Sequence, residues 1–280
     1  MGRSSLLIAA LAALLAGPAA ADLPVAWTLP GLADPESVAI SVDNRTLYVT
    51  NVAGEGDAKD GNGFISRVSP QGRMIERTWV TGLDAPTGAI VQGGRLWVSD
   101  ITQLVEIDIA TSRVAARHLV AGATFLNDVA ALSNGTVLVA DSGTGRIFAL
   151  RQGVASVWLQ DPLLRAVNGL LPEANRLLVT TMAGRLLAIE YATRRITVLA
   201  EGLGNGDGVA PAGGGDYYVS EWPGRLYRVT PGGAVTPVMD GRKAETYIND
   251  FIRVGNILIV PHWKPGALTA YRVPGRLRRP

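Results

Sequence analysis

The sequence contains no cysteine, and only two of its 280 residues are histidine. The absence of cysteine excludes disulfide bonds, so the folded core and any bound ion must supply the stability of this chain. It also excludes thiolate ligands, and the scarcity of histidine further disfavours a typical zinc site. Any metal site in this protein is therefore expected to consist mainly of oxygen ligands.

Charged residues account for 18% of the chain and aromatic residues for only 6%. The basic residues are scattered, and three of them fall in the C-terminal GRLRRP, where we expect residues 276–280 to form a basic tail. A basic stripe with interleaved aromatic side chains is missing, which argues against nucleic-acid binding. Hydrophobic residues make up 48% of the chain, enough for a substantial core.

Long hydrophobic runs are missing except at the N-terminus. The opening MGRSSLLIAALAALLAGPAAA has one arginine, an apolar run and small residues around Ala19 and Ala21, which is typical of a secretory signal peptide. We expect residues 1–21 to be removed and the mature chain to be exported, to the periplasm or as a secreted protein. The apolar run is short for a membrane anchor, and we expect no transmembrane segment in the mature chain.

What the sequence does contain is a repeat of about forty residues. LNDVAALSNGTVLVADSGTGRIFAL and GDGVAPAGGGDYYVSEWPGRLYRV illustrate it: a polar opener, a short apolar strand, a Gly-containing turn and two further strands. Four short strands per unit, in six units, predict an all-β six-bladed β-propeller with four antiparallel strands per blade over residues 23–275. The last unit lacks a fourth strand, and we expect PVAWTL near the mature N-terminus to supply it and close the ring.

Two sets of polar residues are predicted to meet at one mouth of the central channel. In an antiparallel blade, the residue that opens the first strand and the residue that ends the second lie on the same face. The openers are Glu36, Thr87, Asn127 with Asp128, Asn168, Asp207 and Asn249 with Asp250. The second-strand ends are Asn51, Asp100, Asp141, Thr181, Glu221 and His262.

Oxygen-bearing side chains dominate the openers and indicate a divalent cation. Clustered carboxylates raise one another's pKa unless a cation neutralises them, and hard oxygen ligands suit Ca²⁺ first, with Mg²⁺, Mn²⁺ or Zn²⁺ as alternatives. The best ligand set is Glu36, Asn127, Asn168 and Asp207. The competing interpretation is turn chemistry, because Asn, Asp and Gly open strands for that reason alone, and Asp207 lies in the glycine-rich GNGDG. The predicted pocket rim comprises Phe125, Asp128, Asn51, Asp100, Asp141, Glu221, Asn249 and Asp250.

These segments also carry a family resemblance. FLNDVAALSNG, VNGLLPEANRLLV and GDGVAPAGGGDYYVSEW resemble blades of the regucalcin/gluconolactonase family, six-bladed propellers related to the paraoxonases. The resemblance implies that Glu36, Asn168 and Asp207 hold a catalytic cation and that Asn127 and Asp128 contribute to the metal shell or substrate pocket. Sugar-lactonase members often carry an arginine two residues before the third-blade asparagine. Phe125 occupies that position here, which argues against an aldonolactone substrate.

The expected activity is the metal-dependent hydrolysis of lactones or related esters. The cation would polarise the ester carbonyl, and a nearby base would activate water. Asp207 is the first candidate for that base, and His262 is a weaker second because its predicted position is the same mouth. A non-catalytic exported propeller that binds a small ligand or protein partner at its mouth remains the main alternative. A redox or lyase propeller is a third, because fold alone does not decide function.

Overall fold

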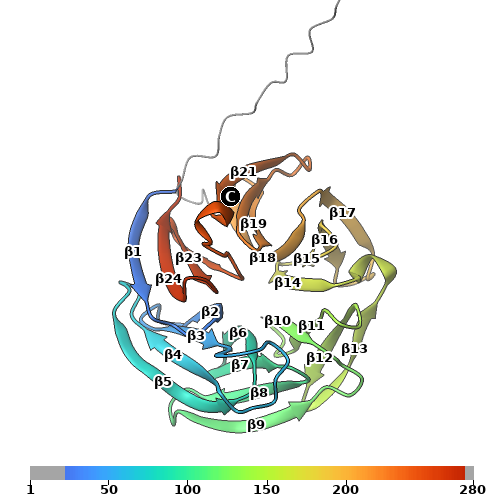
Figure 1. Ribbon diagram of the computed structural model, residues 1–280. Helices are drawn as coiled ribbons and strands as arrows, with labels where there is room; N and C mark the ends of the chain where they lie inside the picture. The colour runs from blue at the N-terminus through green and yellow to red at the C-terminus, as the bar shows by residue number, and fades with distance from the viewer. Residues whose placement is uncertain (1–22, 275–280) are drawn as a thin grey trace, which may run out of the picture.

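The computed structural model describes residues 23–274, and six four-stranded antiparallel sheets surround a central channel in it (Figure 1). The chain follows the ring in sequence order, so that neighbouring blades are consecutive in sequence. This confirms the predicted six-bladed β-propeller. The predicted signal peptide, residues 1–21, and the basic tail, residues 276–280, lie outside the described residues.

Each blade contains its strands in order from the channel outward. The first three blades comprise β2 (Pro35–Ile40), β3 (Leu47–Asn51), β4 (Gly63–Val68) and β5 (Met74–Leu83); β6 (Pro86–Gln92), β7 (Arg95–Asp100), β8 (Gln103–Asp108) and β9 (Arg113–Leu119); and β10 (Leu126–Ala131), β11 (Val137–Asp141), β12 (Arg146–Arg151) and β13 (Val154–Gln160).

The remaining blades follow the same pattern. They comprise β14 (Val167–Pro172), β15 (Arg176–Thr181), β16 (Arg185–Glu190) and β17 (Ile196–Glu201); β18 (Asn205–Gly213), β19 (Asp216–Trp222), β20 (Arg225–Val229) and β21 (Val235–Asp240); and β22 (Ile252–Val254), β23 (Ile257–His262), β24 (Ala267–Arg272) and β1 (Val25–Pro30). Two short 3₁₀ helices, η1 (Pro162–Leu164) and η2 (Arg242–Ala244), lie in connections. No helix within residues 23–274 has the length and apolar character of a membrane span.

The ring is closed by its first strand. β1 pairs antiparallel with β24 and becomes the outermost strand of the sixth blade, as Figure 1 shows at the meeting of blue and red. The Trp27 indole N–H donates to the carbonyl of Pro70 at 3.0 Å, which ties this strand to the first blade. The expectation that PVAWTL supplies the missing strand is confirmed, and the closure joins both ends of the described chain in one sheet.

The hydrophobic core lies between neighbouring blades. Leu138 and Ala140 of β11, for example, pack in one cluster with Leu177 and Val179 of β15, and all four are 0% exposed. Each such leucine or valine contributes about 1.5–3 kcal/mol by leaving water. The blades are thus held to one another by apolar packing, and the channel they surround is free to carry polar side chains.

The innermost strands of the first five blades share one irregularity. Pro35 pairs with Asn51 and Val38 pairs with Val49, so two residues of β2 face the single residue Thr50 on β3. The same register shift occurs in β6, β10, β14 and β18. Such an irregularity bends the strand and re-aims its side chains. The predicted openers of these blades are the first of the two residues in each shift, namely Glu36, Thr87, Asn127, Asn168 and Asp207.

Candidate functional site

The openers of all six blades come together at one end of the channel. They line a cavity of about 220 Å³, here called the mouth cavity. Each of the six side chains is between 3% and 7% exposed. The six are Glu36, Thr87, Asn127, Asn168, Asp207 and Asn249. Side chains separated by as many as 213 positions in sequence therefore share one polar floor.

Hydroxyl groups of the second strands fix the shape of the register shifts. The Gly169 N–H donates to Thr180 Oγ1 at 2.8 Å, and the Gly208 N–H donates to Ser220 Oγ at 2.8 Å. Thr180 also donates its hydroxyl proton to the carbonyl of Asp207 on the next blade. These bonds satisfy backbone groups that the irregular strands leave out of the sheet ladder, and they hold the openers in place.

The glycines beside Asp207 serve close packing between blades. Asp207 lies within β18, and neither Gly206 nor Gly208 adopts a positive φ. A Cβ atom on Gly208 would lie 2.5 Å from Asp250 Oδ1 and 2.9 Å from its Cα. The structure therefore differs from the tight-turn interpretation of GNGDG: Gly208 is needed because Asp250 and Phe251, which lead into the innermost strand of the sixth blade, approach it closely.

Three oxygens at the mouth cavity are buried without a hydrogen-bond partner among residues 23–274. They are Glu36 Oε2, Asn168 Oδ1 and Asp207 Oδ1. Burying a polar group without a partner is costly, so most buried polar groups in proteins are paired with protein, water or ions. Three such oxygens, contributed by three blades to one cavity, indicate a ligand that accepts lone pairs.

The electrostatics of the cavity point in the same direction. Burial raises the pKa of Glu36 well above its usual range, and nearby carboxylates, Asp207 foremost, raise it further. Burial and the Asp250 carboxylate likewise raise the pKa of Asp207, while a hydrogen bond from the Asn168 side chain lowers it. A cation at the cavity floor would reverse this preference and hold both groups ionised.

Asp128 and Asp250 follow two of the openers but do not line the mouth cavity. They line a second cavity of about 390 Å³ with largely apolar walls, formed farther along the innermost strands. Asp128 accepts the N–H groups of Val129 and Leu170 at 2.7 and 2.6 Å. Asp250 accepts the Ser37 hydroxyl at 2.6 Å, and burial raises its pKa to about 6. Asp128 and Asp250, both predicted for the pocket rim, therefore line the channel away from the mouth cavity.

Several of the second-strand ends hold the chain where it enters an innermost strand. Asp100 accepts the Ala85 N–H at 2.8 Å, and Asp141 accepts the Phe125 N–H at 2.9 Å. Asn51 does the same for Ala33 at 3.1 Å. Thr181 accepts the Arg185 N–H, and Glu221 accepts from Tyr227 and Arg225. None of these ends lines the mouth cavity.

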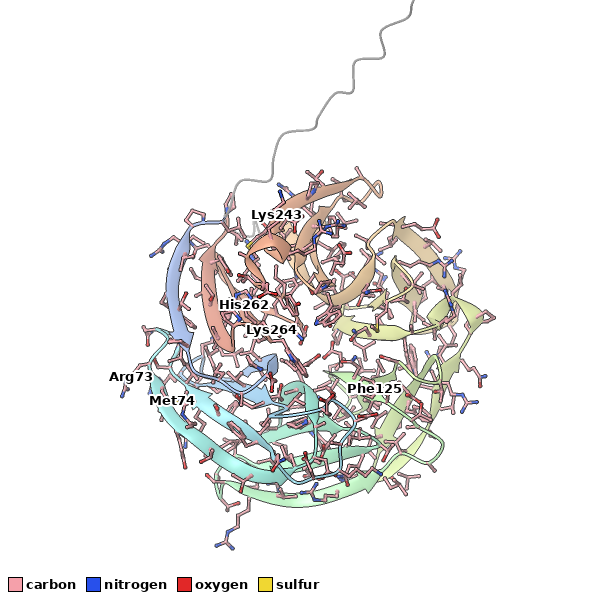
Figure 2. The ribbon with its side chains drawn as sticks, viewed as in Figure 1. Arg73, Met74, Phe125, Lys243, His262 and Lys264 are labelled. Carbon is pink, nitrogen blue, oxygen red and sulfur yellow. The ribbon has the colours of Figure 1, made fainter. Side chains whose placement is uncertain are left out.

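His262 is engaged through both ring nitrogens. Its Nδ1 lies 2.7 Å from the Tyr247 carbonyl, and its Nε2 lies 3.1 Å from the Tyr271 hydroxyl. These partners imply that Nδ1–H donates to the carbonyl and that Nε2 accepts from the tyrosine. His262 is 1% exposed, and burial lowers its pKa. It lies inside the sixth blade, on the other side of the channel from Phe125 in Figure 2.

The sequence interpretation missed four residues that line the mouth cavity. Three of them directly follow the end of a second strand, and the fourth, Trp222, is the last residue of β19. They are Val52, Met182, Trp222 and Trp263, and Phe125 and Gly56 complete the wall. Side chains alternate along a strand, so a polar end residue that turns back into the blade leaves its successor facing the mouth. A large apolar residue directly after the polar residue, as at Asn51, Thr181, Glu221 and His262, is the sequence signal that identifies them.

Comparison with known proteins supports the fold. No family model and no curated protein matches this sequence. Among solved structures, a catalytically inactive variant of virginiamycin B lyase from Staphylococcus aureus with quinupristin gives a TM-score of 0.61 at 12% identity, covering 89% of this chain and 99% of that chain. A streptogramin B lyase gives 0.62 at 13% identity, with coverage of 92% and 86%. A chain of a nidogen/laminin complex gives 0.63 at 17% identity, with coverage of 78% and 84%. At such identities the likeness concerns the fold alone.

Proposed function

We propose that this protein is a divalent-cation-dependent hydrolase of lactones or related esters, gluconolactonase-like and exported. The observation that supports the proposal is the set of three buried, unpartnered oxygens on Glu36, Asn168 and Asp207 at one cavity. The resemblance to the regucalcin/gluconolactonase family implies cation-binding roles for these same three positions. Fold likeness to lyases carries no site and does not enter the argument.

The residues present fit a hard divalent cation such as Ca²⁺. Glu36, Asn127, Asn168 and Asp207 would hold it through two carboxylates and two amides, so that two negative charges balance the charge of the ion. Carboxylates alone are too few: no three His, Cys, Asp or Glu side chains in residues 23–274 are grouped to hold a metal ion. The amides are therefore essential to the proposed site, and water or substrate would complete the shell.

The chemistry follows from the residues at the cavity. A bound divalent cation supplies charge stabilisation at the oxygen of an ester carbonyl. Asp207 is the group that we expect to accept the proton of the attacking water, because it is one of the two carboxylates that line the cavity. Asn168 orients the Asp207 carboxylate through its side-chain hydrogen bond. The apolar wall, including the buried Val52 and the partly buried Trp263, limits the access of bulk water to the reacting ester.

A thermal melt with and without chelator tests the cation. We expect chelation to lower Tm, Ca²⁺ to restore it, and Asp207→Ala to abolish both responses. Asp43→Ala is the matched control, because Asp43 is exposed in the turn between β2 and β3 and does not line the mouth cavity. A melt that does not respond to chelator would remove the cation and the hydrolase with it.

A pH-indicator screen over lactones and aryl esters tests the reaction. We expect Asp207→Ala to lower kcat/KM by about 100-fold or more, the typical loss of a general base. Asp43→Ala should leave it unchanged. Activity that survives Asp207→Ala would contradict the assigned role of Asp207.

The second candidate is a non-catalytic propeller that binds a small ligand at the mouth cavity. It is favoured by the position of His262, whose ring nitrogens are both engaged inside a blade. Among residues 23–274, the titratable side chains that line the cavity are Glu36 and Asp207, which are both proposed cation ligands. A cation-bound protein without activity in the ester screen would favour this alternative.

A further inference from the structure

The wall of the mouth cavity is apolar and aromatic above a polar floor. Five different blades contribute one large apolar residue each at this end of the channel. These residues are Val52, Phe125, Met182, Trp222 and Trp263. Such a wall buries apolar ligand surface, whereas the oxygens below can bind only groups that reach the floor.

Two of the wall residues are unusually open to solvent. Met182 is 38% exposed and Trp222 is 39% exposed, although both are large and apolar. The Trp222 ring packs edge-on against Tyr247, with ring centroids 5.7 Å apart, and Trp263 packs on the buried Val52. The aromatic rings are thus positioned by neighbours that leave part of their surface available to a ligand.

The cavity offers little to an anionic or hydroxyl-rich ligand. Among residues 23–274, no lysine, arginine or histidine lines it, and its ionisable groups are the acids Glu36 and Asp207. Two further polar side chains line the cavity, and their oxygens already have protein partners. Thr87 Oγ1 lies 2.8 Å from Ser99 Oγ, and Asn249 Oδ1 accepts the Trp263 N–H at 3.3 Å. With the floor oxygens assigned to the cation, several sugar hydroxyls would lose water and find few partners, which is unfavourable.

We infer that the substrate is an uncharged lactone or ester with an apolar alkyl or aryl substituent, selected by Met182, Trp222 and Trp263. This inference rests on the hydrolase function proposed above. The wall binds the substituent, and the ester group reaches the oxygen floor. A volume of about 220 Å³ is below the roughly 300–1000 Å³ of drug-sized pockets, so the substituent is short. Phosphorylated and polyhydroxylated lactones are disfavoured, because no basic side chain among residues 23–274 lines the cavity and few of its polar groups are free.

Calorimetric titration with lactams tests ligand class separately from hydrolysis, because a lactam keeps the ring and carbonyl but resists hydrolysis. For alkyl-substituted lactams in the presence of Ca²⁺, each added methylene should tighten Kd by up to about fourfold until the cavity is filled. Gluconolactam, with its hydroxyl groups, should bind at least about tenfold more weakly than the best alkyl lactam.

Wall variants show whether the selection comes from these side chains. Met182→Gln and Trp222→Ser should each weaken alkyl-lactam binding about tenfold and reduce its dependence on chain length. Ile75→Gln is the matched control, because Ile75 is 41% exposed on the outermost strand β5, and it should leave Kd unchanged.

The outcomes separate the two proposals. Alkyl-lactam binding that depends on chain length and on the wall supports the inference, and if no lactone or ester is then hydrolysed, only the hydrolase function fails. Hydrolysis of gluconolactone at least as fast as that of alkyl lactones overturns the inference while the hydrolase function stands. Lactam binding that is indifferent to chain length or to both wall variants also overturns it.

Discussion

The channel holds two pairs of buried carboxylates that differ in what their oxygens contact. Glu36 and Asp207 line the mouth cavity, and each has an oxygen without a protein partner among residues 23–274. Asp128 and Asp250, here called the deeper pair, line the second cavity farther along the channel, and each accepts hydrogen bonds from backbone or hydroxyl groups. Burial raises the pKa of all four. The difference indicates that the deeper pair holds neighbouring blades together, whereas the mouth pair is arranged for a ligand.

Replacing one aspartate of each pair by asparagine should give the largest difference in stability between the two pairs. Asp128→Asn replaces one acceptor of a buried N–H, from Val129 or Leu170, with a donor, and should lower the free energy of unfolding by about 2–4 kcal/mol. Asp207→Asn removes a buried carboxylate whose Oδ1 has no partner, so the chelated protein should be as stable as the wild type or more stable. Urea unfolding in chelator measures both. Equal losses in the two variants would contradict the distinction.

The free energy of unfolding should also depend on pH, and the expected change is similar in size to that of the amide variants. The pKa of Asp250 rises from 3.8 to about 6 on folding, so the folded chain binds this proton more tightly than the unfolded chain does. Stability from this group is fully present below pH 3.8 and is lost as pH rises through about 6, by on the order of 3 kcal/mol. The raised pKa values of Glu36 and Asp207 act in the same direction.

Added Ca²⁺ should reverse that trend at the mouth pair. The proposed cation binds ionised carboxylates, so its affinity and the stability it contributes should increase with pH. We expect the chelated protein to lose Tm between about pH 4 and 7 and the Ca²⁺-saturated protein to lose less. Melts across this range in chelator and in Ca²⁺ provide the measurement, and parallel curves would count against a cation at Glu36 and Asp207.

The sequence predicted the ring of openers because the forty-residue repeat places Glu36, Asn168 and Asp207 at equivalent positions. It could not predict that the neighbours Asn127 and Asp128 line different cavities. Side-chain alternation assigns a face to each residue of a regular strand, but one extra residue in the register changes that assignment. The irregularity depends on hydrogen bonds to the second strand and on close contact with the next blade, neither of which is local in sequence.

The same reasoning explains the error of one residue at the second strands. Polar residues such as Asp141 were predicted to line the mouth because they end the strand. In the structure Asp141 is 0% exposed and accepts the Phe125 N–H and the Thr144 hydroxyl. A carboxylate at a strand end is drawn to nearby unpaired N–H groups. The apolar residue that follows, such as Met182 or Trp222, then contacts the ligand space.

The smallest expected effect concerns the glycine that lets the two carboxylate pairs lie so close together. Gly208 follows Asp207 of the mouth pair and packs against Asp250 of the deeper pair, where a Cβ atom would lie 2.5 Å from Asp250 Oδ1. Gly208→Ala must displace one of the two blades, and overpacking of this kind costs about 1–3 kcal/mol.

Gly232→Ala is the matched control, because its Cβ would meet only Thr230 Oγ1 at 4.0 Å and its φ is not positive. Urea unfolding should distinguish the two variants, and the chelator response of the Gly208 variant should weaken with the displacement of Asp207. If the Gly208 variant is as stable as the Gly232 variant, displacing the innermost strands costs little free energy. The openers would then be positioned by the cation more than by packing between the blades.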